Sequence, residues 1–160
     1  MRELVELHLE RFLKRRNKSA MQLPPMRDGE RTIDARLDVE ERDGLPHVIF
    51  HSRGERRNSD YREGLTLLLR RLHQGGFGIA RIDVDSAKAR ALPAEARTLA
   101  IDVADLSAPE TVALAIGRAS KQVAQKPGAT GGNDTKRLRI VLAAPAPAGE
   151  LWQALWGGGR

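Results

Sequence analysis

The sequence predicts a single α+β domain, in which three to four helices pack on a small, mostly antiparallel sheet of about five strands. The 160 residues are enough for one domain with its own core. Segments in which apolar and polar residues alternate are interleaved with segments that have helical spacing, and glycine or proline turns separate them. Because aromatic residues make up only 4% of the chain, this core must consist mainly of leucine, isoleucine, valine and alanine.

The first third of the chain predicts a helix, a loop and a hairpin. Apolar residues at helical spacing predict a helix over 2–16, and proline and glycine residues predict a loop over 17–30. Strict alternation then predicts a strand over 32–41. Asp43-Gly44 predicts a tight turn into a second strand over 45–50, because Asp-Gly between two such runs is a strong hairpin signal.

The middle of the chain predicts a capped helix followed by strands. Asp60 and Glu63 have the spacing of a capping box, so that a helix is expected from Asp60 to the Gly75-Gly76 pair. Alternating residues predict a strand over 77–85. A short apolar run predicts another strand over 98–102.

The last third predicts two more helices around one more strand. Ser107 and Glu110 form a second capping-box pattern, from which a helix is expected to run to about residue 125. Its apolar stripe consists of Val112, Ile116, Ala119 and Val123. A strand is expected over 136–143, and a terminal helix over 149–156 carries both tryptophans of the chain.

The charge balance is basic. Lysine and arginine number 27 against 21 aspartates and glutamates, a net charge of +6, and 21 of the cations are arginine. Arginine binds phosphate through two parallel hydrogen bonds, which favours a polyanion such as DNA as the partner. The alternative is that the arginine content reflects a GC-rich genome.

Two absences restrict the class of protein. The chain contains no cysteine, which excludes disulfides and cysteine-ligated zinc and suits a cytoplasmic protein. No stretch approaches the roughly 18 to 20 apolar residues that a membrane helix requires, so we expect no membrane partner.

Two basic loops are the strongest candidates for phosphate binding. In the segment 131–137, two glycines allow backbone N–H groups to approach an anion beside a threonine and two cations. The arginine-rich segment 53–61 leads into the start of a helix, where free N–H groups favour phosphate. We predict phosphate contacts from Arg56, Arg57, Lys136, Arg137 and Arg139, and further polar DNA contacts from Asn58, Asn133 and Thr135. The alternative for both loops is solvated charge without a ligand.

Metal-dependent catalysis is the least favoured hypothesis. His47 and His51 would share one face of a strand roughly 13 Å apart, which is too far for one metal ion. Asp83, Asp85 and Asp102 stand at strand ends, where carboxylates can hold Mg²⁺ for phosphodiester cleavage, but the lysine that a restriction-type nuclease adds is missing. We therefore expect no metal, no cofactor and no catalytic residue.

Four segments of the chain resemble, in the same order, the N-terminal head domain of ScoMcrA-like, McrA-type HNH restriction endonucleases. They are residues 57–72, 84–86, 116–118 and 131–140, so that the resemblance covers roughly 55–142. Members of this family recognise phosphorothioated or methylated DNA. Separate downstream domains read the modification, and a C-terminal HNH domain cleaves the DNA.

The resemblance implies a role in DNA restriction without catalysis by this chain. The sequence contains no HNH motif, and 160 residues leave no room for a modification-reading domain beside the head. The leading hypothesis is therefore a non-catalytic head-type module, residues 1–160, whose partners are DNA and a separate endonuclease or reader domain. The second hypothesis is a protein-interaction or dimerisation module that uses its leucine-rich helices or Trp152 and Trp156; a small Mg²⁺-dependent nuclease is the third.

Overall fold

In a computed structural model of the chain, the structure describes residues 27–28, 31–32, 35–52, 58–86, 89, 91–101, 106–127 and 137–156. The helix expected over 2–16 lies outside these residues, as does the first part of the loop expected over 17–30.

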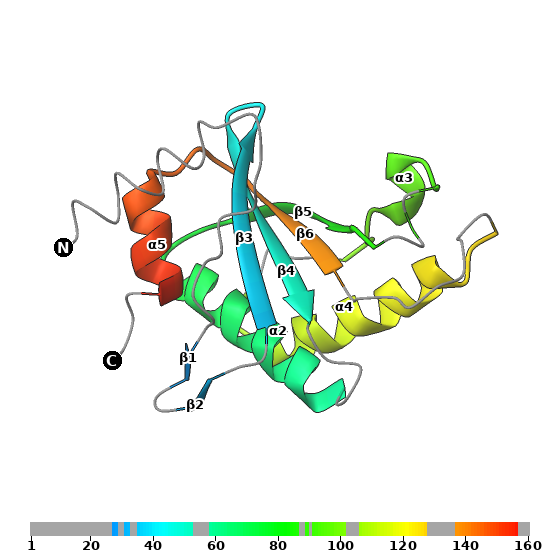
Figure 1. Cartoon of the computed structure of the whole chain (residues 1–160), viewed down its shortest axis with the longest axis horizontal. Helices are drawn as coiled ribbons and strands as arrows, with labels where there is room; N and C mark the ends of the chain where they lie inside the picture. Colours follow the sequence, from blue (N-terminus) through cyan, green and yellow to red (C-terminus); the bar gives the residue numbers. More distant parts are fainter. Residues whose placement is uncertain are drawn as a thin grey trace.

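Four strands form one antiparallel sheet, in the order β3-β4-β6-β5 (Figure 1). The strands are β3 (Ala35–Arg42), β4 (Leu45–Ser52), β5 (Ile79–Val84) and β6 (Arg137–Leu142). A separate pair consists of β1 (Arg27–Asp28) and β2 (Arg31–Thr32). The fifth strand of the sheet, expected over 98–102, is absent from the described residues because Thr98 makes only a single bridge to Asp83.

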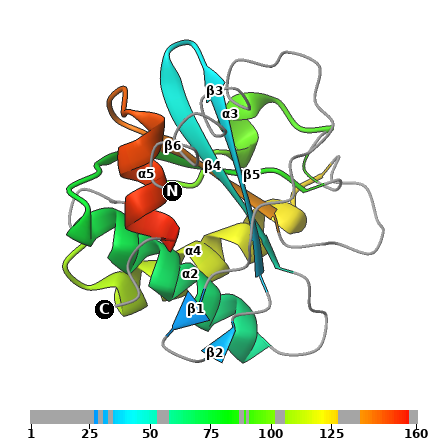
Figure 2. The ribbon, with the colours of Figure 1, turned by 60° about the vertical axis from the view of Figure 1, so that its left-hand side comes forward.

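The described residues form four helices, which are α2 (Asn58–Gln74), α3 (Ala94–Arg97), α4 (Pro109–Ala124) and α5 (Ala148–Trp156). The predicted α+β class is confirmed. Figure 2 shows α2, α4 and α5 grouped together, while the short α3 lies apart from them. None of the helices in the described ranges is long and apolar enough to cross a lipid bilayer.

Both predicted helix starts are displaced by one or two residues. Helix α2 begins at Asn58, so Asp60 lies inside its first turn and is not the residue that caps it. The cap of α4 is Ala108, which makes no side-chain capping bond, and not Ser107. The reason in α4 is Pro109, whose fixed φ favours the first helical position and therefore places the cap one residue before it.

Two turns follow the predicted glycines. Asp43 and Gly44 both have positive φ, at 55° and 78°, as the two-residue hairpin turn between β3 and β4 requires. Gly76 has φ of 79° after the end of α2, and the N–H of Phe77 then donates to the Leu72 carbonyl at 2.9 Å. This bond closes the helix in the glycine-dependent C-terminal motif.

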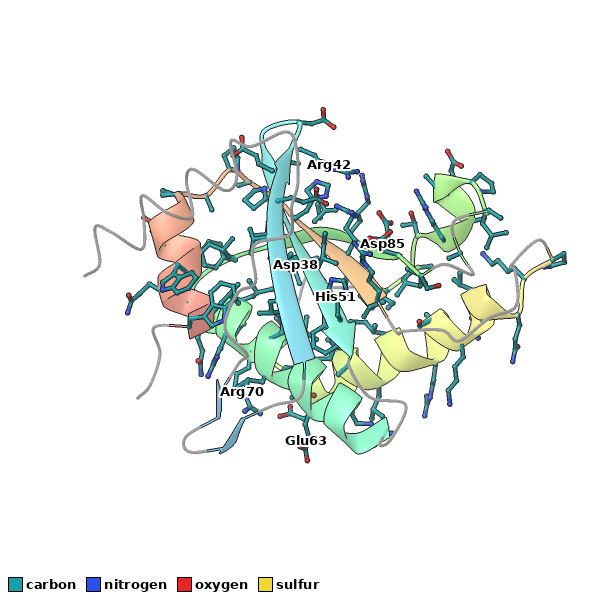
Figure 3. The ribbon with its side chains drawn as sticks, viewed as in Figure 1. Asp38, Arg42, His51, Glu63, Arg70 and Asp85 are labelled. Atoms are coloured by element: carbon teal, nitrogen blue, oxygen red, sulfur yellow. The ribbon has the colours of Figure 1, made fainter. Side chains whose placement is uncertain are left out.

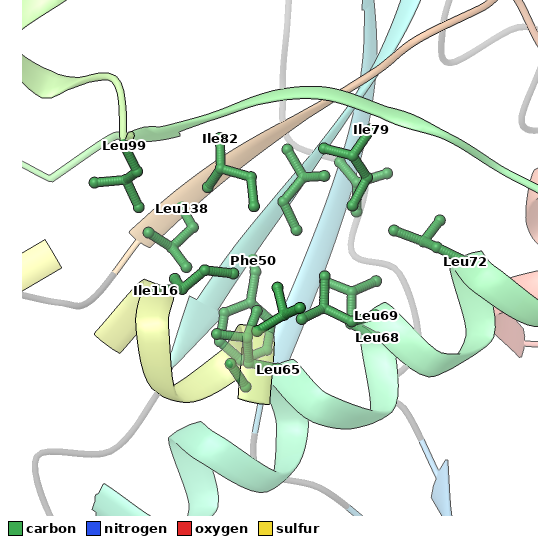
Figure 4. Packing of buried hydrophobic residues seen from close by; sticks show 14 of the residues in the cluster. Phe50, Leu65, Leu68, Leu69, Leu72, Ile79, Ile82, Leu99, Ile116 and Leu138 are labelled. Carbon is green, nitrogen blue, oxygen red and sulfur yellow. The ribbon is translucent and has the colours of Figure 1, made fainter. Parts of the chain in front are cut away.

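One hydrophobic core lies between the sheet and the helices (Figure 4). Phe50 and Leu138 from the strands meet Leu68 of α2 and Ile116 of α4, and all four side chains are fully buried. The predicted apolar stripe of α4 is confirmed, with Val112, Ile116 and Val123 buried and Ala119 partly buried. The leucines of α2 therefore belong to the core, which leaves them out of any interaction surface.

The two tryptophans of α5 pack against the edge of the same core. Trp152 and Trp156 are partly buried there, and their ring centroids lie 4.6 Å apart. Arg71 of α2 also donates to the carbonyl of Leu155 at 2.6 Å. These contacts attach α5 to α2.

Candidate functional site

The face of the sheet opposite the core carries charged side chains. Because residues alternate between the two faces of a strand, Ile49 and Val141 point away from the core, and both are buried without belonging to the core cluster. We call the polar residues around them the charged face; it consists of Asp38, Glu40, His47, His51, Arg81, Asp83, Asp85, Arg137 and Arg139. Figure 3 labels three of them, Asp38, His51 and Asp85.

Arg139 is the cation at the centre of the charged face. Its Nη1 donates to Glu40 Oε1 at 2.5 Å, and its Nη2 donates to Asp85 Oδ2 at 3.2 Å. Only 12% of the Arg139 side chain is exposed, so that solvent screens these ion pairs weakly. The arginine thus ties β6 to β3 and to the end of β5.

His47 lies beside this arginine, in surroundings that favour its neutral form. Its Nδ1 lies 3.2 Å from Arg139 Nη1, and because a guanidinium can only donate, Nδ1 must accept this hydrogen bond. Burial lowers the pKa of His47, and the charge of Arg139 lowers it further, whereas Glu40 acts in the opposite direction. The site therefore favours an uncharged imidazole.

A second histidine pairs with an acid across the outer strand pair. His51 Nε2 lies 2.8 Å from Asp38 Oδ2, and both side chains are largely buried. On its other side, His51 is the register partner of Arg137 in β6.

The carboxylates at the end of β5 are also occupied. Asp83 Oδ1 accepts a hydrogen bond from Thr98 Oγ1 at 2.7 Å, and its Oδ2 accepts one from Arg81 Nε at 3.0 Å. Asp85 Oδ2 lies 3.2 Å from Arg137 Nε as well as from Arg139. The Asp85–Arg137 contact is an ion pair without hydrogen-bond geometry, since Arg137 Nε has no hydrogen-bond partner.

The charges of this face compensate one another. It contains four carboxylates against three guanidinium groups, and a fourth guanidinium, Arg42, pairs with Glu40 at the hairpin end; each of these four arginines lies within ion-pair distance of a carboxylate. A surface with this balance does not attract phosphate by net charge. The arginines of this face that reach solvent are Arg81, with 54% of its side chain exposed, and Arg137, with 28%.

Arg137 stands at the end of the sheet where β6 begins. Among the residues predicted to contact DNA, the structure describes the side chains of Arg137 and Arg139, and it describes the backbone of Asn58 as the first residue of α2. The Arg137 side chain is 28% exposed, more than twice the fraction of Arg139. The remaining predicted residues, Arg56, Arg57, Asn133, Thr135 and Lys136, lie outside the described residues, and their contacts stay predictions.

The sheet brings the attachment points of the two basic loops together. Strand β4 ends at Ser52, immediately before the segment 53–57, and β6 begins at Arg137, immediately after the segment 131–136. His51 and Arg137 are register partners in neighbouring strands. Two basic segments that are about 80 residues apart in sequence therefore join the same end of the sheet.

The acids of the nuclease hypothesis have other partners. Asp83 and Asp85 bind the threonine and arginine side chains given above, and Asp102 lies outside the described residues. Within the described ranges, no three histidine, aspartate or glutamate side chains gather closely enough to hold a metal ion. The geometry gives the nuclease hypothesis no support.

Sequence reasoning missed a second group of cations, on the outer side of α4. Arg118 and Lys121 are exposed there, on a helix in which no acidic residue follows Glu110. The absence of aspartate and glutamate after Glu110 is the sequence feature that could have identified this group.

Comparison with known proteins identifies the family. A family model described as the N-terminal domain of the type IV restriction enzyme McrA matches residues 23–156, a range that includes every described strand and helix. No curated protein matches the chain. The match confirms the resemblance seen over 55–142 and extends it toward both ends of the chain. With more than half of its residues matched by this model, the chain belongs to the family formed by the N-terminal domain of the type IV restriction enzyme McrA.

Proposed function

We propose that this chain is a non-catalytic head-type module that holds DNA for a restriction enzyme in the cytoplasm. The contact surface is the sheet-end site, which we define as Arg56, Arg57, Lys136 and Arg137. The observation that carries the proposal is the register pair His51–Arg137, because it joins both basic segments to one end of the sheet. Because both segments join the sheet at this pair, we propose that their cations contact neighbouring phosphates of one duplex.

Arg137 is suited to phosphate by the way its side chain is held. Asp85 lies beside its Nε, which orients the side chain without using the two Nη groups. Arginine binds phosphate through these groups in a planar, two-bond geometry. An oriented arginine loses less rotational freedom on binding than a free one, which favours the contact.

Arg139 can contribute less than Arg137. A phosphate contact by Arg139, which the sequence also predicts, requires its ion pairs with Glu40 and Asp85 to be exchanged for the ligand. Within the proposal, Arg139 chiefly keeps Asp85 in place. Asn58 at the start of α2 joins Asn133 and Thr135 as a polar contact.

The proposed contacts position DNA and do not read its sequence, since phosphate contacts carry no base information. Reading a modification and cleaving the strand would then fall to a separate reader or endonuclease domain. Membership of the family formed by the N-terminal domain of a restriction enzyme supports the assignment of DNA positioning to this module and of cleavage to another domain.

Salt-dependent binding to a short duplex, measured by fluorescence anisotropy, tests the proposal. Each phosphate contact adds about 0.9 to the slope of log affinity against log salt, so replacing all four residues of the sheet-end site by alanine should lower this slope by about 3.6. Arg42→Ala is the control, because Arg42 is an exposed cation at the hairpin end of the sheet, roughly 23 Å along β3 from Ala35. A cytosine-methylated duplex measured in parallel shows whether the module itself prefers modified DNA.

Absence of wild-type binding at about 50 mM salt would refute the proposal, since phosphate contacts are strongest at low salt. Binding that the four alanines leave unchanged would refute the assignment to the sheet-end site.

A further inference from the structure

Helix α4 exposes a row of cations without acidic neighbours. Residues 111–127 contain Arg118, Lys121 and Lys126 and no aspartate or glutamate, a net charge of +3. All three cations are exposed. Figure 3 shows nitrogen-ended side chains leaving α4 on the side away from the sheet.

Arg118 and Lys121 differ in their neighbours from Arg70 and Arg81. Arg70 and Arg81 lie 2.6 Å and 3.0 Å from the carboxylates of Glu110 and Asp83. Within the described residues, Arg118 and Lys121 form no ion pair. Their charge is therefore open to a ligand or to mobile counterions.

The spacing places the cations along one side of the helix. Arg118, Lys121, Gln122 and Gln125 are three or four residues apart and all exposed, so that they form one polar stripe. From Arg118 to Gln125, the cap residue of α4, the helix axis rises about 10 Å, a length over which a DNA duplex presents several phosphates. The glutamines add neutral donors that can also bond phosphate oxygens.

Lys126 follows α4 and lies outside the stripe. Lys126 Nζ donates to the Ala96 carbonyl in α3 at 2.5 Å, which connects the end of α4 to the segment beside β5. Thr98 then bonds to Asp83 of β5, and Asp85 after β5 contacts Arg137. Figure 1 shows the C-terminal end of α4, α3 and the start of β6 on the same side of the molecule.

We propose that the outer stripe of α4, consisting of Arg118, Lys121, Gln122 and Gln125, is a second phosphate-contact surface for DNA. The inference rests on the proposed function and adds a surface on the other side of the sheet from the charged face. Charge complementarity selects the ligand, because a stripe with cations and amides but no acids favours a polyanionic backbone.

The double variant Arg118→Ala/Lys121→Ala tests the inference in the full chain by the same anisotropy titration. Loss of two phosphate contacts should lower the salt slope by about 1.8, so that a rise from about 50 to about 200 mM salt weakens wild-type binding about 12-fold more than it weakens the variant. The conservative variant Arg118→Lys/Lys121→Arg should keep the wild-type slope, because both residues neutralise phosphate.

The control is Arg42→Ala/Arg81→Ala, which removes the same two charges from exposed sites outside both surfaces. A slope that falls equally in the control and in the α4 variant would overturn the inference, since net charge alone would then explain it. A wild-type salt slope in the α4 variant would also overturn the inference about α4, and it would not contradict the proposed sheet-end site. Wild-type protein that binds no DNA would overturn both proposals together.

Discussion

The charged face of the sheet and the outer stripe of α4 use the same residue types in opposite ways. On the charged face, Arg139 is almost buried and lies between Glu40 and Asp85. On α4, Arg118 and Lys121 are exposed on a helix whose described surface offers them no acid. The neighbours of an arginine, and not its presence, decide whether it stabilises the fold or is available to a ligand.

The physical reason for this difference is desolvation. A buried guanidinium has lost its water, and the free-energy cost is offset only when carboxylates stand close by. An exposed cation keeps its water and its mobile counterions, and the release of those counterions favours DNA binding. The two regions should therefore respond to mutation in different measurements.

The largest effect is expected for Arg139→Ala. Removing this guanidinium leaves Glu40 and Asp85 in a largely buried site without their central cation, which should lower the free energy of unfolding by about 3 to 5 kcal/mol. Urea denaturation followed by circular dichroism measures this loss.

A double variant sharpens the same prediction. Glu40→Gln combined with Arg139→Met removes both charges of the Arg139–Glu40 ion pair. This double variant should therefore lower the free energy of unfolding by less than Arg139→Ala alone. If Arg139→Ala costs less than about 1 kcal/mol, the charged face behaves like an ordinary surface and the contrast with α4 fails.

A smaller loss of stability is expected for Thr98→Val, which keeps the shape of the side chain and removes the O–H that lies 2.7 Å from Asp83 Oδ1 and 2.8 Å from the Ala94 carbonyl. Since Asp83 is buried, the lost hydrogen bond to its carboxylate should lower stability by about 1.5 kcal/mol. Thr111→Val, on the exposed side of α4, is the matched control and should be nearly neutral in the same denaturation experiment. Equal effects in the two variants would contradict the role given to Thr98.

The third effect depends on pH. Because the pKa of His47 is lowered in the folded protein, the unfolded chain binds a proton more readily than the native one. Stability should therefore fall as the pH drops below about 6.5, the ordinary histidine value. His47→Gln should flatten the curve of urea midpoint against pH, whereas His73→Gln, at an exposed site, should leave the wild-type curve. If His47→Gln keeps the wild-type dependence of the urea midpoint on pH, the charged face does not lower the pKa of His47.

The smallest effect on stability is expected for Arg118→Ala/Lys121→Ala. Both side chains are exposed and without an ion pair in the described structure, so the free energy of unfolding should change by less than about 0.5 kcal/mol while the salt slope of DNA binding changes. Thermal melting provides the measurement. A large loss of stability would assign the stripe to the fold and remove the contrast with the charged face.

Local patterns in the sequence determined much of the fold. Asp43-Gly44 predicted the hairpin and Gly75-Gly76 the end of α2, because each depends on backbone angles that few residues adopt. The stripe beginning at Val112 predicted the buried side of α4, because helical periodicity reports directly which side is apolar. The helix starts were less predictable, since several neighbouring residues could serve as the cap.

Only the tertiary structure decided what the charged residues do. Arg139 of β6 pairs with Glu40 of β3, which is 99 residues away in the sequence. Only β4 lies between these two strands, because the order of strands in the sheet differs from their order in the sequence. The same pairing places His51 opposite Arg137 and joins both basic segments to one sheet end. Strand order and ion pairs arise from contacts between distant residues, which local periodicity does not encode. The sequence by itself therefore determined most of the described elements and their buried sides, whereas the packed sheet decided which cations are neutralised and which face solvent.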